Sequence, residues 1–319
     1  MIKTVKKELF EQIIRLRPTL SPKKRRVADF MMEDYKRLFL MSAKEIAHKC
    51  QVSEPTITRF VMDLGFSGFG EFEHYLKGLL RIELTSVERL IKASKEIDNA
   101  SVLEAYRQNT IVNLENMVQS VSEQEIRDLA QMIHSAESIL VAGYKASATL
   151  AYYFGYLLKK IKSGVIIDTA YSGDNLDAIS LQGESLLVFA IAFPRYPQRA
   201  IELVEYTKKY HAKVVCISDS LKSPVVNLAD HYVIIDMDGF SFIDPFSHII
   251  TFLGALIHEI AYIDKEATAR RLSQIEDGAR RRRDFYTAEQ EESPEYDPLK
   301  MDLKNGGGLS PPKFADTQS

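Results

Sequence analysis

Residues 42–64 read SAKEIAHKCQVSEPTITRFVMDL, with apolar positions at helical spacing on both sides of a two-residue break, Gln51-Val52. This is the spacing of two short helices joined by a tight turn, as in a helix-turn-helix. Ser53 is expected to cap the second helix with its hydroxyl, and Pro55 is tolerated in the first turn, where no intrahelical donor is lost. The predicted buried stripes are Ile46, Ala47 and Cys50 in the first helix and Ile57, Phe60, Val61 and Leu64 in the second.

The outward face of the second helix carries short hydroxyls and one guanidinium near its N-terminus, including Thr56. A recognition helix contacts base edges and phosphates from this position in a major groove. A basic run on the preceding helix would meet the phosphate backbone and supply salt-sensitive affinity. The spacing alone is also compatible with a solvent-exposed helix pair that binds no DNA. The candidate DNA-binding residues are Lys23, Lys24, Arg25, Arg26, Ser42, Ser53, Glu54, Thr56, Thr58 and Arg59.

Charge is distributed unevenly along the 319-residue chain. The net charge is −3, but residues 1–80 carry +5 and the remaining residues −8, which suits a protein whose N-terminal part alone contacts nucleic acid. Cys50 and Cys216 fall within apolar patterns, so neither is expected to form a disulfide or bind a metal. No signal peptide or membrane span is recognisable, and a cytoplasmic location is expected.

Three segments resemble the RpiR (MurR/RpiR) family of bacterial transcription regulators. They are SPKKRRVADFM (21–31), SAKEIAHKCQVSEPTITRFVMDLGFSGFGEF (42–72) and a later sugar-isomerase-like segment, and the similarity runs from about Leu9 to Asp264. The resemblance implies a DNA-binding head joined to a ligand-sensing SIS (sugar isomerase) domain.

The N-terminal region reads as all-helical. A first helix over 5–17 ends at Pro18, a second runs over 22–34, and the glycine cluster at 65–70 predicts a structural turn rather than a phosphate loop. The expected buried residues of the first two helices are Leu9, Ile13, Ile14, Leu16, Val27, Phe30 and Met31. The predicted division is a helix-turn-helix domain at 1–80, a helical linker at 81–100, a SIS-like domain at 101–265, a helix at 266–290 and a disordered tail at 291–319.

From residue 138 onward, short β-branched runs alternate with helical stretches. Such alternation predicts an α/β domain with a doubly wound parallel sheet covered by helices on both faces. Two helices precede it, and Ser122 with Glu125 predicts a capping box at the second. Ligands of such sheets bind outside the carboxyl ends of strands, here the loops after Ala142, Ala192 and Ser218. The expected strands are 139–143, 164–168, 185–193, 212–218 and 231–236, and the expected helices are 102–118, 122–134, 147–162, 197–210 and 245–263.

The resemblance also implies where a ligand would bind. Of the SIS motif G-x-G-x-S-x-x-x-A, this chain keeps Gly143, Ser147 and Ala151 but has Lys145 at the second glycine. The motif S-x-S-G-x-T-x-E is replaced by AFPRYPQR (192–199), so its hydroxyls are absent and Arg199 stands at the glutamate. Lys145 with the two arginines could hold a phosphate or carboxylate, or the arginines merely solvate a turn. The candidate ligand residues are Gly143, Tyr144, Lys145, Ser147, Arg195, Tyr196, Arg199, Asp219 and Ser220, with Ser223 secondary.

An enzyme is not expected, because Arg199 replaces the glutamate that would move a proton. Glu202 lies one step round the helix, and His258 sits in an apolar helix. No cofactor or metal site is predicted. The sequence instead favours a DNA-binding regulator that senses a small anionic metabolite, with a DNA operator, this effector and a second copy of itself, in a dimer or tetramer, as partners. A ligand-blind DNA-binding dimer and a sugar-phosphate isomerase remain alternatives.

Overall fold

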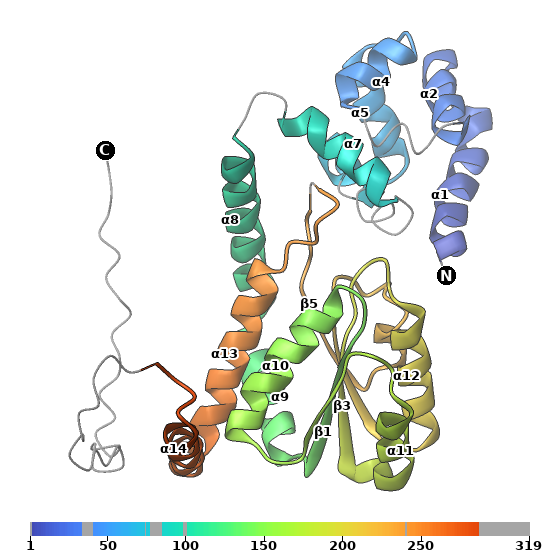
Figure 1. The fold of residues 1–319 in the computed structure, drawn as a ribbon. Coiled ribbons are helices and arrows are strands. Elements are labelled where there is room, and N and C mark those ends of the chain that lie inside the picture. Colours follow the sequence, from blue (N-terminus) through green and yellow to red (C-terminus); the bar gives the residue numbers. More distant parts are fainter. Residues whose placement is uncertain are drawn as a thin grey trace.

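The computed structural model describes residues 2–33, 41–73, 75–76, 85–97, 101–239 and 241–286. Its N-terminal part is helical, as predicted, and its C-terminal part is a sheet covered by helices (Figure 1). The predicted tail at 291–319 and part of the predicted linker lie outside the described residues. None of the described helices is long and apolar enough to cross a membrane.

The head consists of α1 (Ile2–Leu16), the short η1 (Arg17–Thr19), α2 (Pro22–Glu33), α4 (Ala43–Lys49) and α5 (Glu54–Asp63). These elements share one apolar core, in which the helix-turn-helix contributes every residue of its two predicted stripes. Pro18 lies in η1, where α1 ends, as expected. Ile14 is 54% exposed, so its predicted burial is wrong, because Leu9 and Ile13 already define the inner face of α1.

A turn closes the head after α5. Gly65 adopts a φ of +90°, which a residue with a side chain rarely adopts. The chain then folds back, so that the Phe66 ring lies edge-on to Phe72 with centroids 5.2 Å apart, and Phe72 is fully buried. The glycine cluster is therefore a structural turn with an aromatic cover, as predicted.

Three helices connect the head to the sheet: α7 (Ser86–Ile97), α8 (Val102–Ser120) and α9 (Glu123–Ser135). The predicted capping box at the start of α9 is confirmed. Ser122 Oγ accepts from the Glu125 amide at 3.2 Å, and the Glu125 carboxylate accepts from the Ser122 amide at 2.9 Å. These bonds satisfy amides that have no partner within the helix.

All five predicted strands form one parallel sheet in the order β2-β1-β3-β4-β5. Their bounds are β1 Ser138–Gly143, β2 Val165–Asp168, β3 Leu186–Ile191, β4 Lys213–Ser218 and β5 His231–Ile234. The order reverses between β1 and β3, so the loops that follow these two strands leave toward opposite faces. That divergence is where open α/β sheets bind ligands.

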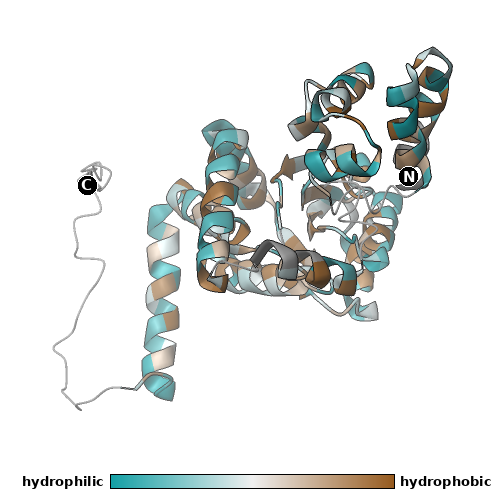
Figure 2. Cartoon of the chain, turned by 90° about the horizontal axis from the view of Figure 1, so that it is seen from above, coloured by the Kyte–Doolittle hydropathy of each residue, from teal (hydrophilic) through white to brown (hydrophobic). Residues whose placement is uncertain are grey.

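Helices cover both faces of the sheet. One face packs against α9, α10 (Ser147–Ile161) and α13 (Ser247–Ile263), and the other against α11 (Gly173–Gln182) and α12 (Gln198–Lys209). Helix α11 was not predicted, because its segment GDNLDAISLQ has a weak apolar stripe and only Ile179 is buried. The mainly polar α14 (Lys265–Arg282) lies at the margin of the domain (Figure 2), where Arg271 donates to the Lys159 carbonyl of α10 at 3.1 Å.

Candidate functional site

The helix-turn-helix corner has a defined geometry. Gln51, in the turn that follows α4, has a φ of +53°, and the Val52 amide donates to the Ala47 carbonyl at 2.9 Å. At the start of α4, Ser42 and Glu45 form a capping box, in which the Ser42 hydroxyl donates to Glu45 Oε2 at 2.8 Å. Both ends of α4 are thereby fixed, and α5 is held at a set angle to it.

Two expectations for the start of α5 are wrong. Thr56 is only 6% exposed, although it was expected on the outer face. It lies four residues before Phe60 and therefore joins the buried stripe. The Ser53 hydroxyl makes no capping bond to an amide. It lies 3.0 Å from Thr56 Oγ1, and the Ser53 carbonyl instead accepts from the Thr56 amide.

The outer face that remains on α5 is formed by Glu54, Thr58 and Arg59. Glu54 and Arg59 are exposed and Thr58 is partly exposed, with its hydroxyl 3.4 Å from the Glu54 carbonyl. Arg59 makes no ion pair with any residue that the structure describes. Its guanidinium is therefore available for an outside partner.

The basic run on α2 has two different roles. Lys24 pairs with Asp63 at the end of α5, and Arg26 donates to the Gln51 carbonyl at 3.0 Å, so these two hold α2 against the helix-turn-helix. Arg25 is 3.4 Å from the Leu20 carbonyl. Lys23 is exposed and pairs with none of the described residues. Of these four cations, Lys23 is therefore the most available to an outside partner.

Gly143 ends β1 at the place where the sheet order reverses. A Cβ at this position would lie 2.5 Å from the Ser147 carbonyl oxygen and 2.9 Å from the Ala151 side chain. The absence of a side chain at Gly143 thus permits the close approach of α10 to β1, and the small side chain of Ala151 faces the same contact. Lys145 follows in a left-handed conformation, with a φ of +56°, and is exposed.

A buried polar cluster lies beside this loop. Tyr144 donates its hydroxyl to Asp168 Oδ2 at 2.6 Å, and Asp168 Oδ1 accepts from the Tyr171 amide at 2.8 Å. Asp168 is fully buried at the end of β2. Burial and the hydrogen bond to Asp168 raise the pKa of Tyr144, so its hydroxyl stays protonated. Asp168 was not among the predicted site residues, although a carboxylate at the end of an apolar strand was a usable signal.

Arg199 reaches the same cluster from the first turn of α12. Its guanidinium carbon lies 4.6 Å from the Tyr171 ring centroid, and its Nη1 donates to Glu202 at 3.0 Å. The structure thus brings together Tyr144, Asp168, Tyr171 and Arg199, of which Tyr144 and Arg199 were predicted. Because Glu202 and the tyrosine ring already engage the guanidinium, Arg199 would bind an anion only in competition with them.

Replacing Tyr144 with phenylalanine is expected to destabilise the sheet domain by about 1–3 kcal/mol, because Asp168 Oδ2 would lose its donor inside the protein. Chemical denaturation followed by circular dichroism measures the change. Tyr153→Phe on α10 is the matched control, since Tyr153 is on the domain surface. Equal stability of the two variants would contradict a structural role for this bond.

The remaining predicted ligand residues lie on the loops after β3 and β4. Tyr196 donates its hydroxyl to Asp219 at 2.7 Å, and Ser218 donates to the Ala192 carbonyl at 2.7 Å, so the two loops are tied together. Ser220 accepts from the Lys222 amide at 3.1 Å, and Arg195 is exposed. Ser223 is buried. These contacts shape the edge of the sheet, on which Lys145 and Arg195 are exposed on the loops after β1 and β3.

Two other features bear on chemistry. Burial raises the pKa of the Cys216 thiol to about 12, and that of Cys50 upward from its ordinary value, so both stay protonated at neutral pH. His258 is exposed on α13, and its Nδ1 lies 3.1 Å from the Gly254 carbonyl.

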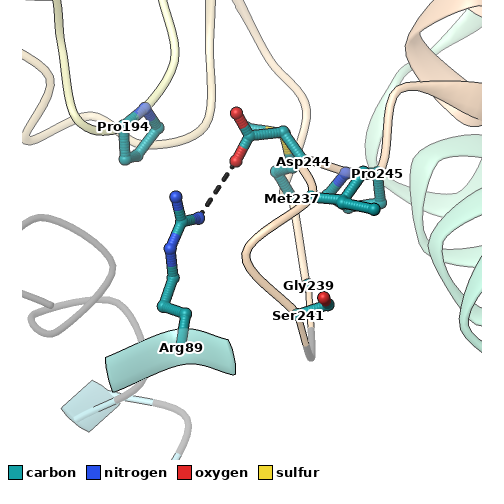
Figure 3. A pocket seen from close by; sticks show the side chains of 8 residues that line it. Arg89, Pro194, Met237, Gly239, Ser241, Asp244 and Pro245 are labelled. Carbon is teal, nitrogen blue, oxygen red and sulfur yellow. Dashed lines mark hydrogen bonds and ion pairs between the residues drawn. The ribbon is translucent and has the colours of Figure 1, made fainter. Parts of the chain in front are cut away.

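A small pocket lies where α7 meets the carboxyl edge of the sheet (Figure 3). Pro194, after β3, forms one side, and the segment between β5 and α13 forms the other. Arg89 of α7 reaches into it and donates to Asp244 at 3.1 Å. This pocket could not be predicted from the sequence, because its residues come from three distant parts of the chain.

Comparison with known families identifies two regions. Residues 7–82 match the helix-turn-helix domain of the rpiR family, and residues 132–259 match the SIS domain. An uncharacterised HTH-type transcriptional regulator of Haemophilus influenzae is 23% identical over 222 residues, which cover 68% of this chain and 75% of the relative. A bifunctional protein glk of Paraburkholderia xenovorans is 25% identical, and there the match spans only 38% of the relative.

Two solved structures share the fold. The sugar isomerase domain of an RpiR transcription factor from Sphaerobacter thermophilus is 19% identical with a TM-score of 0.53, covering 55% of this chain and 98% of that one. The Vibrio vulnificus NanR protein, solved in complex with ManNAc-6P, is 17% identical with a TM-score of 0.50, covering 86% of this chain and 98% of that one. At these identities the likeness establishes the fold alone.

Proposed function

This chain is a transcriptional regulator of the RpiR family, with a helix-turn-helix domain followed by a SIS domain, and from that premise we propose that its SIS domain senses a small anionic metabolite. The metabolite, a sugar phosphate or a carboxylate, controls binding of the head to a DNA operator. Lys23 and Arg59 contact the operator, with Ser42, Ser53, Glu54, Thr58 and the other α2 cations around them. The protein acts in the cytoplasm and is not an enzyme.

The observation that carries the effector proposal is the charge at the switch-point edge. Lys145 and Arg195 are exposed on the loops after β1 and β3, at the place where open parallel sheets bind ligands. Each of these cations stands where its family motif has a glycine, the motif hydroxyls on the second loop are absent, and the two charges favour an anion by charge-assisted bonds. The related NanR protein was solved with ManNAc-6P, which supports a phosphorylated sugar as the first class to test.

We also propose a homodimer or tetramer. One recognition helix covers only a few base pairs, so useful specificity needs at least two heads. Apolar side chains remain exposed on two helices that both pack against α13, which supports association there. They are Val102, Leu103, Val112 and Val118 on α8 and Tyr152 and Tyr156 on α10.

The test is a thermal-shift screen of the full chain against sugar phosphates, sugar acids and other carboxylates. A ligand at about 100 times its Kd stabilises the protein by about 2.7 kcal/mol through mass action. We expect Lys145→Ala or Arg195→Ala to remove the shift, while Lys209→Ala, at the opposite end of α12, keeps it. A hit should also change affinity for an operator selected from random duplexes. Shifts that survive both substitutions would place the effector elsewhere.

A ligand-blind regulator is the second candidate. It is favoured by the missing motif hydroxyls and by the engagement of Arg199 with Glu202 and Tyr171. No metabolite in the screen would change the affinity of such a protein for its operator. An isomerase would instead turn over a sugar phosphate without DNA, which Arg199 at the glutamate position of the motif disfavours.

A further inference from the structure

The pocket in Figure 3 joins α7 to the edge of the sheet where a ligand is expected. Arg89 lies outside residues 132–259 that match the SIS domain, whereas Pro194 and Asp244 lie within them. Pro194 precedes Arg195, an exposed cation of this edge. A side chain from the connecting helices therefore completes a pocket of the sheet domain.

The guanidinium of Arg89 is incompletely satisfied. Its side chain is 16% exposed and that of Asp244 is 19% exposed, and their bond runs through Nη1 and one carboxylate oxygen. Arg89 Nε is buried and has no hydrogen-bond partner among the described residues. A guanidinium can bind an oxyanion through the two parallel N–H donors of Nε and Nη2, and the bond to Asp244 uses neither of them.

The segment that carries Asp244 is anchored at its other end. Asn113 of α8 is buried and donates to the Asp238 carbonyl at 2.8 Å, while its own Oδ1 accepts from the Asp238 amide at 2.9 Å. Asn109 donates to the same carbonyl at 2.7 Å. One end of the segment is thus fixed to α8, and Asp244 links the other end to α7.

A second contact joins the head region to the same edge. Lys222, in the loop after β4, lies with its Nζ 4.9 Å from the ring centroid of Tyr75. Figure 1 shows the head and α7 next to this end of the sheet domain. A ligand at the edge therefore binds beside the contacts that position the head.

We propose that Arg89 is an anion-binding residue of the effector site and that Asp244 occupies it in the absence of effector. A phosphate or carboxylate group of the effector accepts from Nε and Nη2, the two parallel donors on one side of the guanidinium, and its negative charge displaces the Asp244 carboxylate from Nη1. The exchange breaks the link between α7 and the segment anchored by Asn113, and so transmits binding to the head. The role of this anion as the effector rests on the proposed function, whereas the binding of an anion by Arg89 does not.

The first test is calorimetric titration of the full chain with two probes, inorganic phosphate and acetate. The ionic strength is held constant with sodium chloride. Asp244→Asn removes the competing charge, so we expect it to bind phosphate about tenfold more tightly than the wild type. Arg89→Gln is expected to lose phosphate binding, and Arg89→Lys to keep part of it. Tighter binding of phosphate than of acetate would identify the phosphorylated class of effector, and the reverse the carboxylate class.

Asp277→Asn and Arg127→Gln are the matched controls, because each makes the same change of charge at an exposed position on α14 or α9. Both should bind the probes as the wild type does. Phosphate binding that is unchanged in Asp244→Asn, that persists in Arg89→Gln, or that is absent in every variant up to tens of millimolar overturns the proposal.

The second test separates this site from the proposed function. For a metabolite that changes operator binding, Arg89→Gln breaks the link to Asp244 by itself, so it should bind the operator with the affinity that the wild type has when the metabolite is bound, and it should lose the response to the metabolite. A full response in Arg89→Gln would overturn the role of Arg89 and leave the sensor function standing. Phosphate binding that depends on Arg89, with no metabolite affecting the operator, would support the anion site and count against the sensor function.

Discussion

Phe60→Ala is expected to destabilise the head by about 3–5 kcal/mol, the range found when a buried phenylalanine is truncated. Phe60 is fully buried in the core shared by α1, α2, α4 and α5. The cavity would loosen the packing of α5 on α2 and α4, and operator binding should be lost with it. Amide hydrogen exchange of the full chain measures the effect separately in each helix, which matters because a chain with two domains need not unfold in one step.

Met62→Ala is the control for Phe60→Ala, since Met62 lies on the same helix with its side chain exposed. It should leave exchange in the head close to that of the wild type. Exchange in the strands β1 and β3 should be unchanged in both variants, because the head and the sheet domain have separate apolar cores. Wild-type operator affinity in Phe60→Ala would contradict the assignment of α5 as the recognition helix.

Arg59→Ala should weaken specific operator binding by about 1–3 kcal/mol, or about 5- to 150-fold, without changing hydrogen exchange in the head. Arg59 is exposed on the outer face of α5 and pairs with none of the described residues, so its loss leaves no buried group without a partner. Gel-shift titrations against the selected operator and against an unrelated duplex measure the two affinities.

The comparison of the two duplexes defines the role of Arg59. A loss on the operator alone indicates a base contact, whereas an equal loss on both, with a shallower salt dependence, indicates a phosphate contact. Arg127→Ala on α9 removes the same charge far along the chain from α5 and should bind as the wild type does. Unchanged affinity in Arg59→Ala would show that another face of the head reads the DNA.

Much of the fold follows from local sequence patterns. The stripes of residues 42–64 and the alternation after residue 138 predicted the helix-turn-helix and the parallel sheet correctly, because helix and strand periods are local properties of the chain. Capping is equally local, as Ser122 and Glu125 show. The failure at Ser53 arose within the same turn, where the hydroxyl of Thr56 offered a different partner.

The tertiary structure alone decided which residues distant in the sequence contact each other. Tyr144 and Asp168 are 24 positions apart and Arg89 and Asp244 155 apart, and no periodicity relates the members of either pair. Packing of α7 against the sheet edge and of β2 beside β1 brings them together. The sequence by itself determined the two domains and their family, because those depend on local patterns and motifs. The tertiary structure decided the hydrogen-bond partners of these polar side chains, because a polar group removed from water must be satisfied by whatever neighbour the packing supplies.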